Sequence, residues 1–594
     1  MDQPQQWTAK TLEIAPAPEK TEIPATQGRL RRLAGRAEIR DWQIAALIAL
    51  AFVALRAPFR AGYLINWDSV NFALALQHFD VLHHQPHPPG YIGYVGLGRA
   101  LMAFTGDANA ALTLLSTLSG GIATAALYGL ARSFLPRWHA LAVAVLFGTS
   151  PVLWYYSSVA LTYAVEAAVA IPALWACYVA RKRVSLGHLA VATFLLALLG
   201  ALRQSGLVLL VPIWLYTLWA FPWQTRARIF AAFVALNTAW LVPLLVSSGG
   251  LDAYVRESMA LASLVGFRTY IFTMDPTGLI QNMGLVAVGL AIGMNVGLVV
   301  WVICLIAGVR PAPLSREDSR FFLLWAIPSL ATYLLVHTGQ VGYVLMVLPI
   351  GFIWLGRMLA GERLQPVAAR RLIPNSATLG VLAPIPRLSN AGAGAIALLV
   401  VANIVSFGRL QAMSLPGNDE AIKEAVYVAA GDGFVEDWRL RQYNARASDL
   451  HWKSMTEFIG RYPAESTVVL TMPTLSGSFR QASYYLPRYG VYGVGWDLQG
   501  QWGHLYAASG GRTDYNLQNL ERGSGELQLG SRVTRVIIPD FEVYDRLDPR
   551  ITGYLHTIAD GSEVAVVDLP EPGATLLFEP WGQVTLSLPH ELLE

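Results

Sequence analysis

The chain has 594 residues, of which 54% are hydrophobic and only 14% are charged. Soluble globular proteins carry roughly 25% charged residues, so the composition argues against a soluble protein and predicts a polytopic membrane protein. The net charge of +3 gives no reason to expect nucleic-acid binding. Both cysteines lie inside apolar segments and form no CxxC pair, which argues against a disulfide framework, redox chemistry and a cysteine-held metal.

The first 28 residues are polar and rich in Pro, Gln and Glu, and they lack the hydrophobic segment of a signal peptide. Five arginines follow between positions 29 and 40. We therefore expect residues 1–40 to form a disordered basic tail. Because positively charged residues stay on the cytoplasmic side of a bilayer, we expect this tail in the cytoplasm.

Apolar segments of membrane-spanning length, about 20 residues, follow one another from residue 41 to residue 408. They are 41–57, 109–131, 138–154, 159–180, 187–202, 205–221, 227–247, 281–308, 319–336, 340–360 and 391–408. A shorter apolar segment covers 90–104. The sequence thus predicts a polytopic α-helical domain at 41–408 with about 11–13 transmembrane helices in an inner or plasma membrane.

The basic residues also predict the orientation of the spans. A cytoplasmic N-terminus places the first loop, 58–90, on the extracytoplasmic face. Alternation then places 248–280 and the break at 337–340 on the same face. The loop 248–280 mixes aromatic, charged and apolar residues. This mixture fits either a helix lying in the membrane interface or an ordinary connector.

One conflict in this topology concerns the segment 90–104. Arg132 and Arg137 favour the cytoplasm, which leaves no room for 90–104 as a full crossing. Either 90–104 is a half-span that returns to the outer face, or 138–158 is split into two short helices. We favour the half-span.

The first outer loop concentrates side chains that can perform chemistry. It contains the run Trp67-Asp68-Ser69-Val70-Asn71-Phe72 and the later run His83-His84-Gln85-Pro86-His87-Pro88-Pro89-Gly90-Tyr91. The prolines restrict the backbone around His87 and remove donors next to it. An acid flanked by aromatic residues, followed by imidazoles and a rigid Pro-Pro-Gly, is more than an inter-helix loop requires.

Further polar residues near span ends fall on the same predicted face. These candidates are Asp80, Tyr163, Glu166, Arg203, Gln204, His337 and Tyr343. Ionisable residues at membrane depth are costly and usually functional. Structural roles remain open for the candidates of both groups. Asp68 can cap a helix. The pair His83-His84 can be solvated, and Arg203 can reach lipid head groups.

From about residue 409 the composition changes, because charged residues, Gly and Asn increase and the long apolar segments stop. Short β-like runs occur at 467–472, 532–539, 563–569, 575–579 and 584–588, and a helical segment covers 450–460. This pattern predicts a C-terminal extracytoplasmic α/β domain at 409–594. It contains no recognisable catalytic motif.

These motifs resemble the GT-C class of membrane glycosyltransferases. An acid after the first span, a long outer loop ending in Gln85-Pro86-His87-Pro88-Pro89-Gly90-Tyr91, and many later spans are similar to its protein O-mannosyltransferase and aminoarabinose-transferase branch. Thr162-Tyr163-Ala164-Val165-Glu166 and the run 339–349 also match, so the resemblance covers roughly 41–360. One departure is that the acidic pair common after the first span is here Asp68-Ser69, with a single acid.

The resemblance implies a fold of the GT-C type and transfer of a mannose-like or related sugar, with inversion, from a polyprenyl-phosphate donor to an acceptor hydroxyl on the extracytoplasmic face. Asp68 would be the general base. The donor phosphate would be bound by Arg203, His87, Tyr343 and His337. The acceptor or sugar would be oriented by Glu166, Asp80, Tyr163 and Gln204. The acceptor could be a protein, a lipid or a glycan, and membrane lipids would surround the domain.

The resemblance requires no cofactor. A divalent metal between Asp68, Asp80 and the histidines is chemically feasible, but no HxH, HExxH or DxD spacing indicates one. Two other functions remain open. A transporter or flippase of lipid-linked glycans would also be polytopic, although its ionisable residues would lie at the midplane in repeats. A non-catalytic scaffold could bind glycans through aromatic residues of the C-terminal domain: Tyr484, Tyr485, Trp496 and Trp502.

Overall fold

A computed structural model gives the structure of the chain. It describes residues 40–266, 274, 276–360 except 307, 310 and 312, 390–412, 445–471, 478–496, 503–509, 512–514, 526–577 except 545, 546, 548–550 and 552, and 585–586. Backbone contacts divide the chain into two units, Met1–Ile44 and Ala45–Glu594. Nearly all of the predicted basic tail lies outside the described residues.

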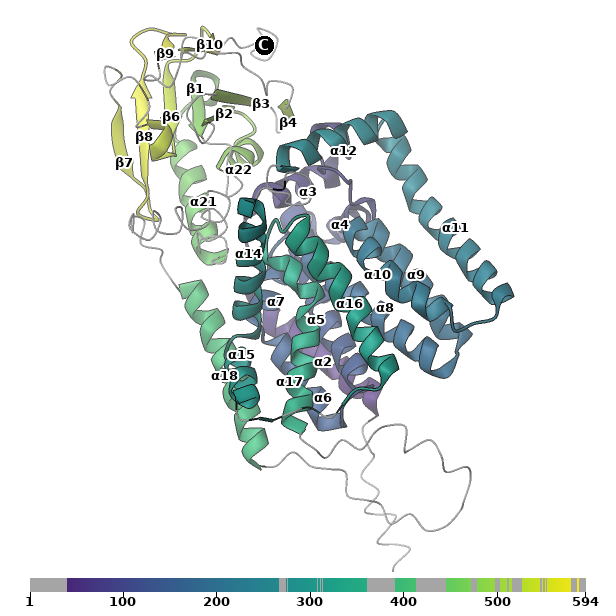
Figure 1. Ribbon diagram of the computed structural model, residues 1–594. Helices are drawn as coiled ribbons and strands as arrows, with labels where there is room; N and C mark the ends of the chain where they lie inside the picture. Colours follow the sequence, from purple (N-terminus) through teal and green to yellow (C-terminus); the bar gives the residue numbers. More distant parts are fainter. Residues whose placement is uncertain are drawn as a thin grey trace, which may run out of the picture. The chain divides into compact units, whose positions relative to one another are not determined.

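The larger unit begins with a helical domain that carries the predicted spans (Figure 1). Its α-helices are α2 (Asp41–Arg56), which starts in the N-terminal unit, α3 (Trp67–Gln77), α4 (Ile92–Thr105), α5 (Ala108–Ala131), α6 (Arg137–Gly148), α7 (Pro151–Tyr156), α8 (Tyr163–Arg183), α9 (Leu186–Leu202), α10 (Gln204–Leu218), α11 (Trp223–Ser247), α12 (Leu251–Gly266), α14 (Pro276–Met294), α15 (Val296–Ile306), α16 (Arg316–Leu335), α17 (Leu348–Ala360) and α18 (Asn390–Ala412). Short 3₁₀ helices are η1 (Ala57–Phe59), η2 (Val81–His83) and η3 (Val341–Met346).

Length and hydropathy confirm the helical membrane fold. Among the described residues, four helical segments are long and apolar enough to cross a membrane: Asp41–Phe59, α5, α8 and α11. The pair Gly278–Met294 and Val296–Ile306 passes the same test together, with a bend of 93° at Asn295. Six shorter apolar helices of 10–17 residues accompany them: Ile92–Thr105, Arg137–Gly148, Leu186–Leu202, Gln204–Leu218, Leu348–Ala360 and Ile396–Gly408.

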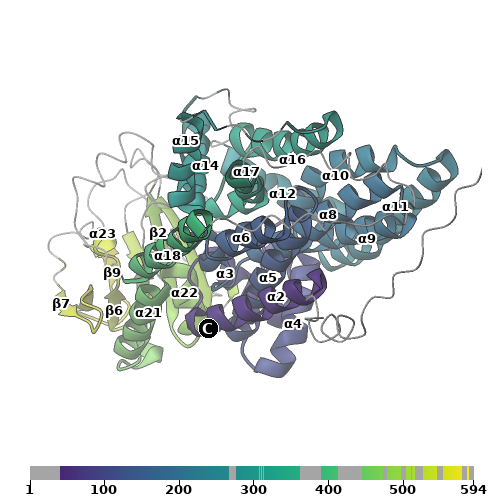
Figure 2. The same cartoon turned by 90° about the horizontal axis from the view of Figure 1, so that it is seen from below.

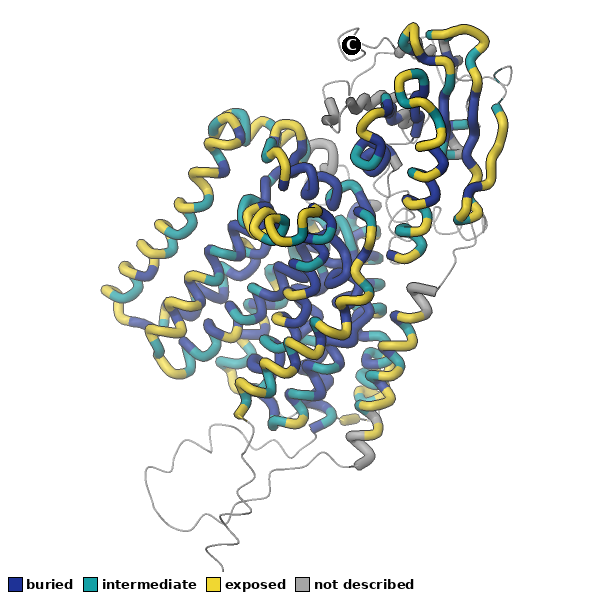
Figure 3. Tube along the Cα trace, turned by 180° about the vertical axis from the view of Figure 1, so that it is seen from behind, coloured by how far each residue is buried: buried dark blue, intermediate teal, exposed yellow. Residues whose placement is uncertain are grey.

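Burial separates the centre of the helical domain from its periphery. Helices α5 and α8 are buried along most of their length, whereas α11 packs on α9 (Figures 1 and 2) and buries only Ile229 and Leu244. Figure 3 shows the same contrast, with exposed residues along α11. The residues that α11 exposes are mainly apolar, which suits contact with lipid. Small residues permit the central packing, since a Cβ at Gly121 would lie 2.7 Å from the carbonyl oxygen of Ala49.

The structure divides two predicted spans and shortens a third. The segment 138–154 forms α6 and α7, because Pro151 begins α7 and supplies no N–H to continue α6. The segment 281–308 breaks at Asn295, whose φ is 50°. The weak segment 90–104 is the 14-residue helix α4. A short α4 and a divided 138–158 therefore occur together, although the sequence presented them as alternatives.

The C-terminal part of the larger unit combines helices with two sheets. Its helices are α21 (Ala445–Ile459), α22 (Ser478–Tyr485) and α23 (Phe541–Tyr544). A seven-stranded sheet has the order β4 (Arg512–Asp514), β3 (Gly503–Ser509), β2 (Gly490–Trp496), β1 (Thr467–Thr471), β6 (Arg535–Ile538), β8 (Glu563–Asp568) and β7 (Tyr554–Thr557). A smaller sheet joins β10 (Thr585–Leu586), β5 (Glu526–Gln528) and β9 (Thr575–Leu577).

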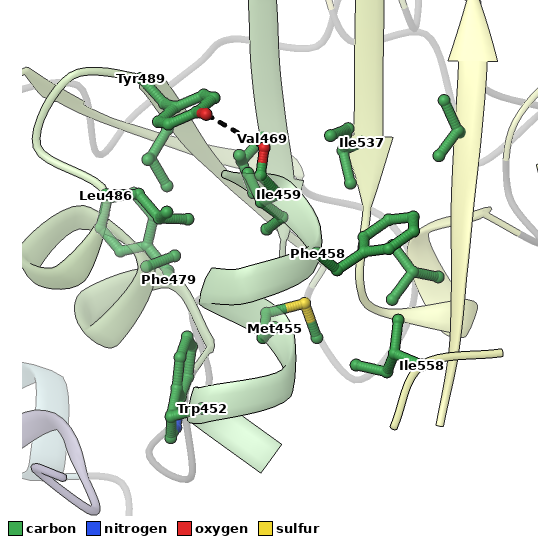
Figure 4. Packing of buried hydrophobic residues seen from close by; sticks show 14 residues of the cluster. Trp452, Met455, Phe458, Ile459, Val469, Phe479, Leu486, Tyr489, Ile537 and Ile558 are labelled. Carbon is green, nitrogen blue, oxygen red and sulfur yellow. Dashed lines mark hydrogen bonds between the residues drawn. The ribbon is translucent and has the colours of Figure 1, made fainter. Parts of the chain in front are cut away.

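The strand β1 lies at the centre of the larger sheet and pairs in parallel with β2 and β6. Its residues point alternately to two cores, as a strand buried on both faces requires. Val468 and Leu470 join one core, and Val469 joins the other. Figure 4 shows the second core, in which Trp452, Met455, Phe458 and Ile459 of α21 pack with Phe479 of α22 and Val469 of β1. This core also contacts Tyr63 and Trp67, and Trp67 immediately precedes Asp68.

The predicted α/β composition of this region is confirmed. Each of the five predicted β-like runs contains an observed strand, and the predicted helix at 450–460 is part of α21. The sequence did not predict β2, β3, β4, β5 and β7, nor the short helix α22. Helix α22 is important below because it contacts α3.

Candidate active site

Helix α3 begins with a reciprocal capping box that places Asp68 in its first turn. The Asn66 side chain accepts a hydrogen bond from the Ser69 N–H (3.0 Å), and the Ser69 hydroxyl oxygen accepts one from the Asn66 N–H (3.0 Å). Such a box satisfies donors that a helix start leaves unpaired. The cap is thus Asn66, and Asp68 does not act as one. Ser69, which stands where the resemblance leads one to expect a second acid, stabilises the helix start.

The Asp68 carboxylate faces the imidazole of His87. Asp68 Oδ1 lies 3.5 Å from His87 Nδ1, and the two side chains are 31% and 14% exposed. The aromatic rings of Phe72 and Tyr91 pack against His87, with centroids 5.6 and 5.1 Å from that of the imidazole. Asp68 therefore keeps access to solvent while an aromatic wall holds its partner. A carboxylate in this setting can accept a proton from an incoming hydroxyl.

Burial is the main influence on the titration of His87. It lowers the pKa of His87, and the positive charges of Arg203 and Arg480 lower it further, whereas the charge of Asp68 raises it. The imidazole is therefore neutral at neutral pH. For the predicted binding of the donor phosphate by His87, a neutral imidazole provides a hydrogen bond without a full positive charge.

A buried ion pair lies at the break between α9 and α10. Arg203 is in an extended conformation there, and its Nε lies 3.2 Å from Glu166 Oε2 of α8. The two side chains are only 6% and 7% exposed. Arg203 Nη1 also donates to the Thr162 hydroxyl (2.7 Å), and Nε donates to the Ser205 hydroxyl (3.2 Å). The Arg203 guanidinium is thus held by two hydrogen bonds in addition to the Glu166 carboxylate, which helps to offset its burial.

Two tyrosines flank this guanidinium. Arg203 Cζ lies 4.3 Å from the centre of the Tyr163 ring and 4.7 Å from that of Tyr343, which η3 supplies. These distances are in the cation–π range. His337, in the break after α16, has its ring centroid 6.2 Å from that of Tyr343. The structure therefore brings together Arg203, Glu166, Tyr163 and Tyr343, with His337 at the edge of the group.

The loop around His87 and the Arg203 break share one backbone carbonyl. The Gln204 amide donates to the Pro89 oxygen (3.2 Å), and the Tyr254 hydroxyl donates to the same oxygen (3.1 Å). Gln204 directly follows Arg203, and Tyr254 belongs to α12. The two groups of predicted residues thus meet at Pro89. The helix α12 also shows that the first half of the 248–280 loop is helical, while residues 267–273 lie outside the described residues.

Asp80 and His83 interact within their own loop, and His84 joins this loop to α12. Asp80 caps η2 by accepting from the N–H groups of Leu82 and His83, and its other oxygen accepts from His83 Nδ1 at 2.7 Å. His84 is buried with its Nε2 3.1 Å from Glu257 Oε1 of α12. Burial lowers the pKa of His84 to about 3. The side-chain contacts of Asp80 described here lie within its own loop, apart from the Arg203 group.

The sequence did not indicate several residues around this site. Thr162 and Tyr91 lie inside motifs named in the sequence analysis, but the sequence indicated no role for either side chain. Asn71 and Arg480 had none either, and Arg480 Nε donates to Asn71 Oδ1 (2.8 Å) across 409 positions of sequence. No local pattern marks such a pair. Among the residues that the structure describes, no group of three or more His, Cys, Asp or Glu side chains is placed to hold a metal ion.

Comparisons with known proteins give similarity at the level of structure. The sequence matches no model of a protein family, and no curated protein matches it. The chain is similar to the crystal structure of ArnT from Cupriavidus metallidurans in the apo state, with 14% identity, a TM-score of 0.45, and coverage of 88% of this chain and 97% of that chain. For the ArnT structure bound to undecaprenyl phosphate, the identity is 15% and the TM-score and coverages are the same.

Proposed function

We propose that this protein is a membrane glycosyltransferase of the GT-C type. It transfers a sugar from a polyprenyl-phosphate donor to an acceptor hydroxyl on the extracytoplasmic face. The observation that carries this proposal is that a hydrogen bond from Gln204 to the Pro89 carbonyl joins two segments. One is the loop of His87, which faces the partly exposed Asp68, and the other is the break that bears the buried guanidinium of Arg203, held by Glu166. The Asp68–His87 pair suits removal of the proton from the acceptor hydroxyl, and the Arg203 guanidinium suits binding of the anionic donor phosphate.

Asp68 is the general base of the proposed reaction. It takes the proton of the acceptor hydroxyl while that oxygen forms a bond to the anomeric carbon. The bond between this carbon and the phosphate oxygen breaks, and its electron pair leaves with the polyprenyl phosphate. Attack from the side opposite the leaving group inverts the anomeric configuration. A positioned base typically contributes about 10²–10⁴-fold to such a step.

Arg203 stabilises the leaving phosphate, whose negative charge grows as the bond breaks. A fixed, desolvated guanidinium is more effective than a solvated one, because it needs no reorganisation during the reaction. Glu166 fixes its orientation, and Tyr163 and Tyr343 form the walls around it. His87 contributes a neutral hydrogen bond, and His337 reaches the same phosphate from the edge of the group.

Acceptor and sugar are oriented by residues that border both groups. Gln204 binds the Pro89 carbonyl and thereby couples the His87 loop to the Arg203 break. The contacts of Asp80 favour an indirect role, in which its carboxylate maintains the loop that presents His87. The sugar is proposed to be mannose-like or a related hexose, and the acceptor a protein, a lipid or a glycan.

The test is sugar transfer by the purified full-length protein with a radiolabelled polyprenyl-phosphate mannose donor and detergent-solubilised membrane extract as acceptor. Asp68→Asn is expected to reduce transfer by roughly 10²-fold or more while the donor still binds. Asp252→Asn is the control, because the Asp252 side chain is 97% exposed on α12. Transfer by Asp68→Asn near the unmodified rate would refute the base assignment.

The same assay separates the transferase from a transporter. A transferase yields free polyprenyl phosphate and labelled product in detergent, where there are no two compartments. A flippase leaves the donor intact in detergent and changes only its distribution across a sealed vesicle. Intact donor together with such redistribution would replace the proposed function with the flippase.

A further inference from the structure

The start of α3 is held by the C-terminal part of the chain. The Asp449 carboxylate on α21 accepts hydrogen bonds from the N–H groups of Gly62 and Tyr63, both at 2.8 Å. The Tyr485 hydroxyl on α22 accepts one from the Leu64 N–H at 2.7 Å. Three consecutive backbone donors, ending four residues before Asp68, therefore have partners more than 380 positions away in sequence.

Arg480 of α22 contacts two residues of α3 close to Asp68. Its side chain is fully buried, and its Nε donates to Asn71 Oδ1 at 2.8 Å. Asn71 is three residues after Asp68, so both side chains lie on one face of α3. The guanidinium also lies 5.5 Å from the centre of the Trp67 ring, directly before Asp68. Arg480 thus contacts the residues on both sides of Asp68 along the helix.

A buried guanidinium is costly, so its location here requires a reason. The contact with Asn71 places the permanent positive charge of Arg480 about one helical turn along α3 from the carboxylate that the proposed function uses as a base. The hydrogen bond to Asn71 and the contact with the Trp67 ring restrict the orientation of this part of α3.

We propose that Arg480 is a positioning residue for Asp68. Through Asn71 and Trp67 it fixes the first turns of α3, and it adds a permanent positive charge beside the Asp68–His87 pair. The catalytic role of Asp68 in this inference rests on the proposed function. The placement of the Arg480 charge beside the Asp68–His87 pair does not depend on the proposed function.

The titration of His87 supports the geometry and supplies a readout independent of catalysis. The charged and titratable groups around His87 are Asp68 on α3, His84 and Tyr91 on its own loop, Arg203 at the break before α10, and Arg480 on α22. Arg480 and Arg203 both lower the pKa of His87. Removing the Arg480 charge is therefore expected to raise the pKa of His87.

The experiment compares Arg480→Gln, Arg480→Lys and the control Arg488→Gln in the purified full-length protein. Arg488 is exposed and belongs to the same part of the chain, two residues after Leu486. Histidine C2-hydrogen exchange, followed by mass spectrometry, gives the pKa of His87 in each variant. Transfer assays with polyprenyl-phosphate mannose give kcat and the donor KM, and circular dichroism checks folding.

Arg480→Gln is expected to lower kcat roughly 10- to 100-fold, as a misplaced catalytic group does, with the donor KM within about twofold, and to raise the pKa of His87. Arg480→Lys keeps the charge and loses the fixed donor, so kcat falls and the pKa of His87 stays. Arg488→Gln leaves both unchanged. A folded Arg480→Gln variant with unaltered kcat and unaltered His87 titration overturns the inference.

The two proposals fail in different ways. If the unmodified protein transfers no sugar, the proposed function fails, and the pKa of His87 in Arg480→Gln still tests whether the charge acts at this site. If transfer occurs and neither quantity responds to Arg480→Gln, only the inference fails. Should Arg480→Gln not fold, Arg480→Lys decides: a reduced kcat supports positioning, and an unchanged kcat overturns it.

Discussion

Arg203 Nε lies 3.2 Å from Glu166 Oε2, and this pair joins α8 to the break between α9 and α10. Neither partner has more than 7% of its side chain exposed. Removing one charge from such a pair leaves the other buried without compensation, which costs about 3–5 kcal/mol. The pair is therefore expected to contribute to stability as well as to the proposed reaction.

Glu166→Gln tests this dependence. It should lower the thermal unfolding temperature and abolish transfer, because Arg203 loses its counter-charge. The double variant Glu166→Leu with Arg203→Met should recover much of the stability but no activity, since no buried charge remains. Unfolding of the purified protein followed by circular dichroism distinguishes the variants. Equal unfolding temperatures for Glu166→Gln and the unmodified chain would contradict the burial of this charge pair.

Gly206 offers a steric test of the same pair. A Cβ at this position would lie 2.7 Å from Glu166 Oε1, so Gly206→Ala must displace the carboxylate from Arg203. We expect kcat for transfer to fall roughly 10-fold or more, since small displacements in an active site are costly. The control is Gly187→Ala near the start of α9, where a Cβ meets nothing within 4 Å. Similar kinetics for the two variants would show that the Glu166 position does not matter.

The protonation of His87 should depend on Asp68 with a defined sign. Burial lowers the pKa of His87 below its usual value of about 6.5, while Asp68 opposes that shift. Asp68→Asn should therefore lower the pKa further and keep the imidazole neutral to lower pH. Because the folded pKa is depressed, the contribution of neutral His87 to stability is present above about pH 6.5 and is lost as the pH falls through the folded value. Histidine C2-hydrogen exchange measures the shift, and a rise of the pKa in Asp68→Asn contradicts it.

The predicted orientation can be tested at two exposed positions. Asp252 lies in the first turn of α12 on the predicted outer face, and Arg183 ends α8 on the predicted cytoplasmic face. In a chain with Cys177→Ser and Cys304→Ser, Asp252→Cys should react with a membrane-impermeant maleimide in intact spheroplasts. Arg183→Cys should react only after lysis. The reverse pattern would invert the topology and place the site in the cytoplasm.

Local sequence features identified many of the candidate residues because their signals are local. Hydropathy indicates helices wherever about 20 apolar residues follow one another, and glycine or proline indicates breaks such as those near Arg203 and His337. These features also placed Asp68, Glu166 and Arg203 near span ends. They left open whether 138–158 is one helix or two and did not single out Pro151 as the break, because the hydropathy of that segment continues across it.

By itself, the sequence determined the membrane-helical class, the α/β composition of the C-terminal part and the candidate residues, because each follows from composition or from periodicity within about 20 residues. Only the tertiary structure decided which side chains meet. It paired Arg203 with Glu166, assigned Ser69 to the helix cap and kept Asp80 within its loop. It also placed Arg480 against Asn71, 409 positions earlier. The physical reason is that such pairs form through the packing of distant elements, which leaves no pattern in neighbouring residues.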